Sequence, residues 1–335
     1  MFFLNRFYSL FFLFCFFNFS STAQSNQKTS SDTKQSSFKK WGYVYSNSFE
    51  KFSSSYIQKI QKNYDILCVT GLMFRGTGQL RFENEFLNKL DKAGIDLRSE
   101  KPLIYPMVTL SSIKDGIQLL TKQSSKLKSI QNLSNFLKKN GLKGVHLDFE
   151  GLPEDYSKEL GSYLEDLKNE LSKDDIKLTF AIFPQIEFSS VRLFHNPENI
   201  ASNVDEVVLM SYDLHNMKTS PGCVSSPEWT KKNIEELLKY FSTEKIWLGI
   251  PAYGYEWSTK SKRVNVISAR EAEILLSHYV YTRDENSCIK IQKKEKEKES
   301  IIYYSDRETR KQIFNSISHL NLAGTALWRL GLEED

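Results

Sequence analysis

The stretch from Gly144 to Gly151, GVHLDFEG, carries three ionisable side chains in an otherwise apolar segment. Because β-strand side chains alternate between two faces, His146, Asp148 and Glu150 share one face and the apolar residues share the other. Buried charges are costly unless they are paired or used. The structural alternative is a buried ion-pair network, but no Lys or Arg neighbours the carboxylates on this face. The pattern therefore favours acid–base chemistry.

Later apolar runs carry residues suited to the same kind of site. One ends in Met210, Tyr212 and Asp213, the next contains Tyr253, and the last contains Trp328. Aromatic rings stack on the apolar faces of sugars, and carboxylates act on glycosidic bonds, so together these residues indicate a sugar site. Each has a structural alternative: the Tyr and Trp are core aromatics, the Met is a pocket wall, and the Asp is a helix cap.

Eight short apolar runs have to position these side chains, and amphipathic or loop segments separate them. Such alternation indicates βαβ units and a parallel sheet. Eight units in roughly 300 residues predict a single TIM (β/α)8 barrel, whose active site lies at the C-terminal ends of its strands. No Gly-rich phosphate loop follows the first run, which disfavours a doubly wound sheet. We expect at most a small insertion between strands seven and eight. The runs begin at Trp41, Asp65, Leu103, Gly144, Lys177, Val204, Lys245 and Gly324.

Local patterns add detail to this prediction. Residues 125–140 and 155–174 have the leucine spacing of amphipathic helices. The predicted apolar stripes are Leu127, Ile130, Leu133 and Leu137 in the first, and Leu160, Leu164, Leu167 and Leu171 in the second. Residues 293–299, KKEKEKE, alternate in charge and predict a solvated loop. His195, His215, His278 and His319 share no spacing, and we expect them at the surface or in loops.

The N-terminus has the plan of an exported protein. Residues 1–23 contain one early basic residue, an apolar run and a small-residue end at Ala23, which predicts a signal peptide cleaved near that residue. An uncleaved membrane anchor is the alternative, although the run is short for a span. Residues 24–40 are polar and predict a flexible linker, so the folded domain is expected over 41–335. We therefore expect a secreted or periplasmic protein without stable membrane insertion.

Composition narrows the class of partner. The 335 residues are 40% hydrophobic, with a formal net charge of +4 that is spread along the chain, which argues against nucleic acid as a partner. After cleavage three cysteines remain. Cys68 lies in an apolar run and is expected to be buried. Cys223 and Cys288 could pair in an oxidising compartment, and the sequence leaves this open.

At four places the chain resembles glycoside hydrolase family 18, the chitinase-like family. The family signature Asp-Gly-x-Asp-x-Asp-x-Glu aligns with residues 143–150, and Met-x-Tyr-Asp is matched by residues 210–213. The Gly-x-Pro-x-Tyr-Gly pattern is matched by residues 249–254, and the tryptophan of strand eight by Trp328. The matches occur in family order, so the resemblance covers essentially residues 41–335.

The resemblance implies substrate-assisted hydrolysis, an exception to the usual scheme of two catalytic carboxylates. Glu150 would be the general acid and then the base, and the substrate's own N-acetyl carbonyl oxygen would be the nucleophile. Asp148 would hold the acetamido N–H, Tyr212 would bind the acetamido oxygen, and Asp213 would support that pocket. The remaining implied substrate contacts are Trp328, which would form the floor under the sugar, and Met210, Tyr253 and His146.

Two family aspartates are absent from the signature. Lys143 replaces the first and is expected to face away from the barrel interior. His146 replaces the second, beneath Asp148, where it would either donate a hydrogen bond to that residue or pin it downward. This departure keeps two alternatives open: a chitinase-like lectin with little turnover, and a hydrolase with a divalent metal on His146, Asp148 and Glu150. Retention of Glu150 argues against the lectin, and no second His motif completes a metal site.

These observations together predict a secreted glycoside hydrolase that cleaves β-1,4 bonds in a GlcNAc-containing glycan with retention. Chitin, chitooligosaccharides, peptidoglycan and N-glycan cores all satisfy the acetamido requirement. Because no carbohydrate-binding repeat accompanies the predicted barrel, we favour peptidoglycan or its fragments. We expect a monomer that needs no cofactor and no metal.

Overall fold

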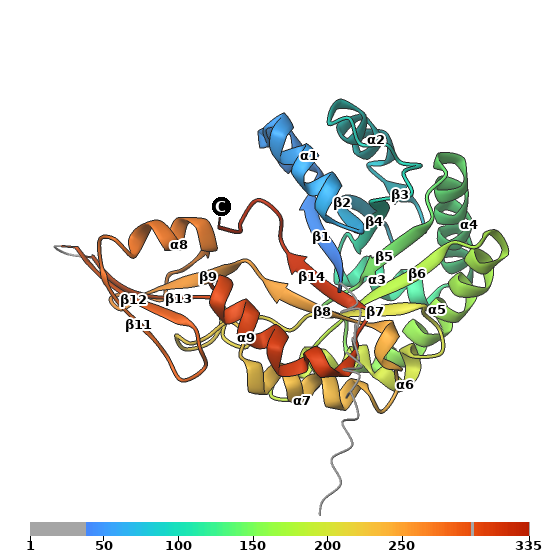
Figure 1. Ribbon diagram of the computed structural model, residues 1–335. Helices are drawn as coiled ribbons and strands as arrows, with labels where there is room; N and C mark the ends of the chain where they lie inside the picture. The colour runs from blue at the N-terminus through green and yellow to red at the C-terminus, as the bar shows by residue number, and fades with distance from the viewer. Residues whose placement is uncertain (1–37, 296–297, 335) are drawn as a thin grey trace, which may run out of the picture. The chain divides into compact units, whose positions relative to one another are not determined.

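The computed structural model of the protein describes residues 38–295 and 298–334. Eight parallel strands form a closed barrel in the order β1-β14-β8-β7-β6-β5-β4-β2, and β1 pairs with β2 to close it (Figure 1). The predicted barrel is confirmed, and each of the eight apolar runs contains one strand. The strands are β1 (Lys39–Tyr45), β2 (Ile66–Phe74), β4 (Leu103–Leu110), β5 (Gly144–Asp148), β6 (Lys177–Ile182), β7 (Glu206–Leu209), β8 (Ile246–Pro251) and β14 (Gly324–Trp328).

The folded domain begins slightly earlier than expected. Lys39 and Lys40, which fall at the end of the predicted linker, belong to β1, and the ring of Phe38 lies edge-on to Phe314 at 4.7 Å between centroids. A hydrophobic residue that packs against the domain was therefore assigned to a polar segment. The predicted signal peptide, residues 1–23, and residues 24–37 of the predicted linker lie outside the described residues.

Helices surround the barrel and cover its outer face (Figure 1). They are α1 (Ser54–Asn63), α2 (Glu83–Lys92), α3 (Ile113–Thr121), α4 (Gln123–Asn140), α5 (Ser157–Leu171), α6 (Pro197–Ile200), α7 (Pro227–Leu237) and α9 (Arg307–Ile317). The four leucines predicted as one stripe on α5 are all fully buried. On α4 the prediction is wrong at Leu127, which is 55% exposed. Within the described ranges, no helix has both the length and the apolar character needed to cross a membrane.

The alternation along β5 has the predicted consequence. Val145, Leu147 and Phe149 are fully buried in the core between strands and helices, and the Phe149 ring lies 5.8 Å from the ring of Tyr163 on α5. The same alternation turns the polar residues of β5 inward. Burial of the apolar side chains therefore fixes the face on which the carboxylates lie.

The predicted insertion between strands seven and eight is a five-stranded antiparallel sheet with one helix (Figure 1). It consists of β9 (Tyr253–Ser258), β10 (Val264–Ser268), α8 (Ala269–Leu275), β11 (Val280–Arg283), β12 (Ile289–Glu295) and β13 (Lys298–Tyr304). The prediction of a solvated loop over residues 293–299 is wrong, because β12 and β13 pair through this run. Alternating charge matches the strand period, so Lys294 lies opposite Glu299.

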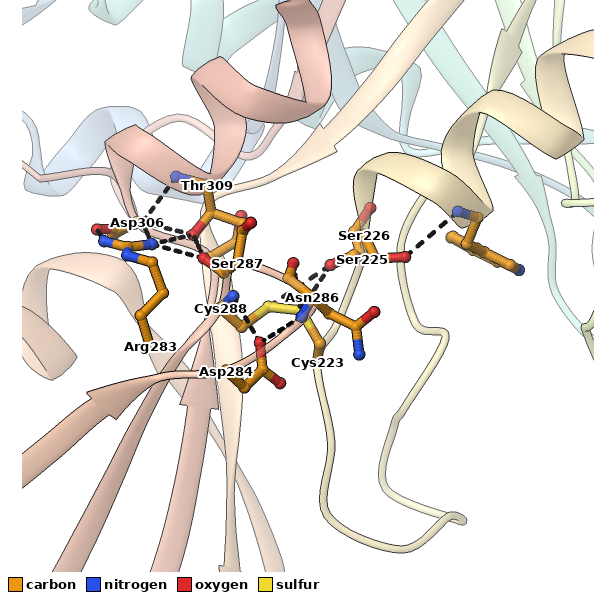
Figure 2. Close-up of a disulfide and its surroundings, with 12 residues drawn as sticks. Cys223, Ser225, Ser226, Arg283, Asp284, Asn286, Ser287, Cys288, Asp306 and Thr309 are labelled. Carbon is orange, nitrogen blue, oxygen red and sulfur yellow. Dashed lines mark hydrogen bonds and ion pairs between the residues drawn. A yellow bond between two sulfur atoms is a disulfide. The ribbon is translucent and has the colours of Figure 1, made fainter. Parts of the chain in front are cut away.

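A disulfide ties this insertion to the barrel (Figure 2). Cys223, in the segment between β7 and α7, is bonded to Cys288 at the turn before β12, so the pairing that the sequence left open is made. The Asp284 carboxylate accepts the backbone N–H groups of Asn286 and Cys288 and holds this turn. The segment after β7 and the insertion are thus joined covalently.

Candidate active site

A cavity of about 320 Å³ lies at the C-terminal ends of the barrel strands. All eight predicted site residues line it: Glu150, Asp148, Tyr212, Asp213, Trp328, Met210, Tyr253 and His146. Six further lining residues were not predicted: Tyr43, Tyr45, Thr70, Met107, Thr109 and Ala181. These six come mainly from β1, β2 and β4, whose sequences read as ordinary apolar strands. The fold thus brings together residues that lie far apart in the sequence.

Asp148 and Glu150 are neighbouring carboxyl groups whose ionisations affect each other. Burial, followed by the Glu150 charge, raises the pKa of Asp148 well above its usual range. Glu150 reaches solvent at the mouth of the cavity, yet desolvation by the surrounding protein still raises its pKa, as does the charge of Asp213. The Oδ1 atom of Asp148 is buried without a hydrogen-bond partner among the described residues.

Asp213 is held quite differently, by two tyrosines of the insertion. The hydroxyl groups of Tyr253 and Tyr255, both on β9, donate to the same Oδ1 atom of Asp213. The backbone of Asp213 has a φ of 63°, in the left-handed region that non-glycine residues seldom adopt. Burial raises the pKa of Asp213, whereas the two tyrosine hydrogen bonds oppose that rise. Sequence reasoning missed Tyr255, although the strand period places it on the same face as Tyr253.

An aromatic platform forms the floor of the cavity. The rings of Tyr212 and Trp328 are stacked with centroids 6.3 Å apart, and the Tyr43 ring meets Trp328 edge-on at 5.0 Å. Burial, followed by the charges of the three carboxylates, raises the pKa of Tyr212 well above its usual range, so its hydroxyl keeps its proton. Gly249 on β8 permits this arrangement, because a Cβ there would lie 2.4 Å from the Leu209 carbonyl oxygen.

His146 does not bond Asp148 as predicted. Its Nε2 atom lies 2.9 Å from the Tyr43 hydroxyl, and its Nδ1 atom lies 2.9 Å from the Thr179 hydroxyl. Thr179 donates to the Val145 carbonyl oxygen, so it accepts the Nδ1 proton and Tyr43 donates to Nε2. Burial lowers the pKa of His146 to about 3 and keeps the ring neutral. The histidine therefore neither donates to Asp148 nor pins it.

His195 is also placed wrongly by the sequence prediction, because it is fully buried. Its Nδ1 atom accepts the backbone N–H of Phe183, and its Nε2 atom donates to the carbonyl oxygen of Phe149 at 2.7 Å. Phe149 directly precedes Glu150. His195 thus fixes the backbone from which the Glu150 carboxylate projects, a contact that joins residues 46 positions apart.

His146 is not available as a metal ligand in this cavity, because both of its ring nitrogens form hydrogen bonds within the protein. A group of side chains close enough to hold a metal ion does occur in the described part of the chain, at Cys223, Asp284 and Cys288, but its two sulfur atoms are bonded to each other. A neighbouring cavity of about 330 Å³ shares Thr70 and Thr109 with the first, so the site continues along the barrel rim.

The arrangement can perform acid–base chemistry on a sugar. It offers two neighbouring carboxyl groups with raised pKa values, a buried carboxylate oxygen that lacks a donor among the described residues, and a protonated tyrosine within the aromatic floor. These groups suit a substrate with an N–H donor and a carbonyl acceptor close to the bond that breaks.

Comparison with known proteins agrees with this geometry. The family model described as Glycosyl hydrolases family 18 matches residues 16–333. The uncharacterized glycosylase YvbX of Bacillus subtilis is 22% identical over 71% of this chain and 74% of its own length. The cortical fragment-lytic enzyme of B. subtilis is 23% identical over 65% of this chain, which spans only 53% of that relative's length. A chitinase from Chromobacterium violaceum has the same fold, with a TM-score of 0.76, 17% identity, and coverage of 89% of this chain and 96% of the chitinase.

Proposed function

Because this chain belongs to glycosyl hydrolase family 18, we propose that it is a glycosidase that cleaves β-1,4 bonds in a GlcNAc-containing glycan with retention. The observation that carries the proposal is the Asp148–Glu150 pair, in which burial raises the pKa of both carboxyl groups and one Asp148 oxygen has no hydrogen-bond partner among the described residues. A buried acceptor without a donor is energetically costly in the free enzyme, and the acetamido N–H of a bound sugar would supply the missing hydrogen bond.

In the proposed reaction Glu150 protonates the glycosidic oxygen as the C–O bond to the anomeric carbon breaks. The carbonyl oxygen of the substrate's own N-acetyl group attacks the anomeric carbon from the opposite face and closes an oxazolinium ring. Glu150, now ionised, takes a proton from water, whose oxygen opens that ring. Two inversions at one carbon leave the configuration unchanged.

Asp148 and Tyr212 hold the acetamido group in this scheme. The free oxygen of Asp148 accepts the acetamido N–H and stabilises the positive charge that develops on the ring. The Tyr212 hydroxyl, which keeps its proton, donates to the acetamido oxygen. Trp328 stacks under the sugar, and Met210 and Tyr253 complete the wall.

We further propose that the protein is exported through a signal peptide within residues 1–23 and acts as a monomer on peptidoglycan or its fragments. The name of one relative, a cortical fragment-lytic enzyme, supports this substrate, whereas that of the chitinase supports neutral chitin. Both polymers carry the acetamido group that the mechanism requires.

The test is release of a fluorophore from a chitooligosaccharide glycoside by the wild type and by Glu150→Gln, with and without chelator. We expect Glu150→Gln to lower kcat about 10³-fold while sugar binding persists. Glu165→Gln is the matched control, since Glu165 is an exposed glutamate on α5 that does not line the cavity. Equal rates in the wild type and Glu150→Gln would overturn the catalytic role. Binding without turnover in the wild type would indicate a lectin, and loss with chelator would indicate a metal enzyme.

A further inference from the structure

A second cavity is lined by positively charged residues, and one of them, Arg329, directly follows Trp328 of the active-site cavity in the sequence. This second cavity has a volume of about 580 Å³, and its lining residues include Lys51, Arg270 and Arg329, with no Asp or Glu among them. The hydroxyl groups of Ser48, Ser53 and Tyr56 also line it. We call this space the cationic cavity.

Arg329 connects the two cavities. It follows Trp328 at the end of β14, and its guanidinium carbon lies 4.0 Å from the centroid of the Tyr45 ring. Tyr45 lines the active-site cavity, is 40% exposed, and meets the Trp328 ring edge-on at 6.0 Å. Stacking on Tyr45 orients the planar guanidinium and leaves its N–H donors at the edge, directed away from the ring.

Two of the three cations that line this cavity, Lys51 and Arg329, lack an ion-pair partner within the described residues. Glu333 lies nearby, but its carboxylate accepts the Tyr56 hydroxyl and the Gly331 N–H. Glu334 is paired with Arg310. Lys51 and Arg329 are therefore available to an anion that enters from solvent.

The active-site cavity has the opposite charge. Asp148, Glu150 and Asp213 line it, and no Lys or Arg does. An anionic substituent on a bound glycan is thus disfavoured beside the acid–base pair and favoured on the Arg329 side of Tyr45. This difference in charge between the two cavities would orient an anionic glycan along the cleft, whereas it would have no effect on the orientation of a neutral polymer.

We propose that the cationic cavity binds a carboxylate carried by the glycan whose acetylated sugar occupies the active-site cavity. This inference rests on the proposed function and narrows its substrate to a carboxylate-bearing amino-sugar polymer, such as one with lactyl ethers on alternate sugars, in preference to chitin. Arg329 supplies the paired donors that a carboxylate accepts, and Lys51 adds a second charge.

Binding to a catalytically silent protein tests the proposal apart from turnover. Full-length Glu150→Gln is titrated by calorimetry with two ligands of equal length: neutral chitotetraose, and a tetrasaccharide of alternating GlcNAc and N-acetylmuramic acid. We expect Arg329→Gln, added to this protein, to raise the ratio of the anionic Kd to the neutral Kd about 10- to 100-fold. Added salt should raise the anionic Kd selectively.

Lys51→Gln provides a second variant, because Lys51 is exposed and does not stack on Tyr45. It should raise the same ratio about threefold to tenfold. Lys59→Gln is its matched control, an exposed lysine on α1 that does not line the cavity. Arg329→Lys, which keeps the charge, should restore part of the ratio.

Equal weakening of both ligands by Arg329→Gln would overturn the proposal and assign Arg329 a purely structural role at Tyr45. An unchanged ratio in both variants, or no binding of either tetrasaccharide, would overturn it as well. None of these outcomes depends on hydrolysis, so the fluorophore assay still decides the proposed function separately. If Arg329→Gln weakens binding of the anionic ligand alone and the wild type shows no turnover, the anion site is upheld in a protein that binds glycans without cleaving them.

Discussion

Asp148 and Asp213 end up in the same cavity from two strands of one barrel, yet their surroundings are opposite. Asp148, on β5, has a partnerless buried oxygen and lies beside Glu150. Asp213, just after β7, has two tyrosine hydroxyls on one oxygen and a left-handed backbone. One carboxylate is left undersatisfied so that a substrate can complete it, and the other is saturated so that it stays in place. The barrel supplies the reactive side of the site, and the insertion supplies the fixed side.

The largest expected effect comes from removing the reactive carboxylate. Asp148→Asn should lower turnover about 10²- to 10³-fold, because the negative charge that stabilises the developing oxazolinium ring is lost. A raised pKa in the folded state means that Asp148 destabilises the fold once the pH exceeds the ordinary pKa of an aspartate, at which the unfolded chain ionises. The same variant should therefore raise the free energy of unfolding at pH 7 by about 0.5–2 kcal/mol, measured by urea denaturation.

Asp213→Asn is the matched comparison for stability. Its gain should be smaller than that of Asp148→Asn, because the amide loses two charge-assisted hydrogen bonds from the tyrosines. An equal or larger gain from Asp213→Asn would contradict the division between a reactive and a saturated carboxylate.

Opening the disulfide should affect the insertion side alone. Replacing Cys223 and Cys288 by Ser removes a cross-link across 65 residues and should lower the free energy of unfolding by about 2–4 kcal/mol. Amide hydrogen exchange should accelerate in residues 210–226 and 253–258 and stay unchanged in residues 144–150. Uniform acceleration in all three segments would contradict a local tie. Reductant should affect the wild type and leave the double variant unchanged.

The tyrosine hydrogen bonds can be removed one at a time. Tyr255→Phe deletes a 2.8 Å hydrogen bond to Asp213 and should lower stability by about 1.5–3 kcal/mol, with a smaller loss of kcat. Tyr281→Phe, at an exposed tyrosine on β11, is the control and should change neither quantity. A Tyr255→Phe protein with wild-type stability would show that Tyr253 alone holds Asp213.

The smallest expected effect is a shift in the pH profile. The charge of Asp213 raises the pKa of Glu150, and Glu150 must be protonated to act as the acid. Asp213→Asn removes that charge and lowers this pKa, so the basic limb of kcat/KM should move to lower pH by less than about one unit. An unmoved basic limb would mean that Asp213 is not charged in the free enzyme.

Much of the reactive side could be predicted from the sequence. Period-two alternation in GVHLDFEG places Asp148 and Glu150 inward and Leu147 outward, and both placements depend only on neighbouring residues. The eight strands follow from the same kind of local pattern. Such local patterns could not predict the hydrogen-bond partners of His146, because Tyr43 lies 103 positions away in the sequence.

The side of the site that contains Asp213 was harder to predict, because its contacts join segments that are distant in the sequence. Tyr255 and Asp213 are 42 positions apart, and no local pattern links them. His195 looked like a surface residue because its partner, Phe149, is far away in the sequence. The strand pairing of residues 293–295 with residues 298–300 was mistaken for a loop because charge alternation is typical of solvated segments as well as of paired strands.

The hydrogen bonds from Tyr253 and Tyr255 to Asp213, together with the disulfide, also bear on how the insertion can be altered. Both join the insertion to the segment that carries Asp213, so deleting the insertion from a descendant would remove both ties at once. The insertion and the segment that carries Asp213 therefore form one structural unit, whereas neither tie reaches the β5 motif.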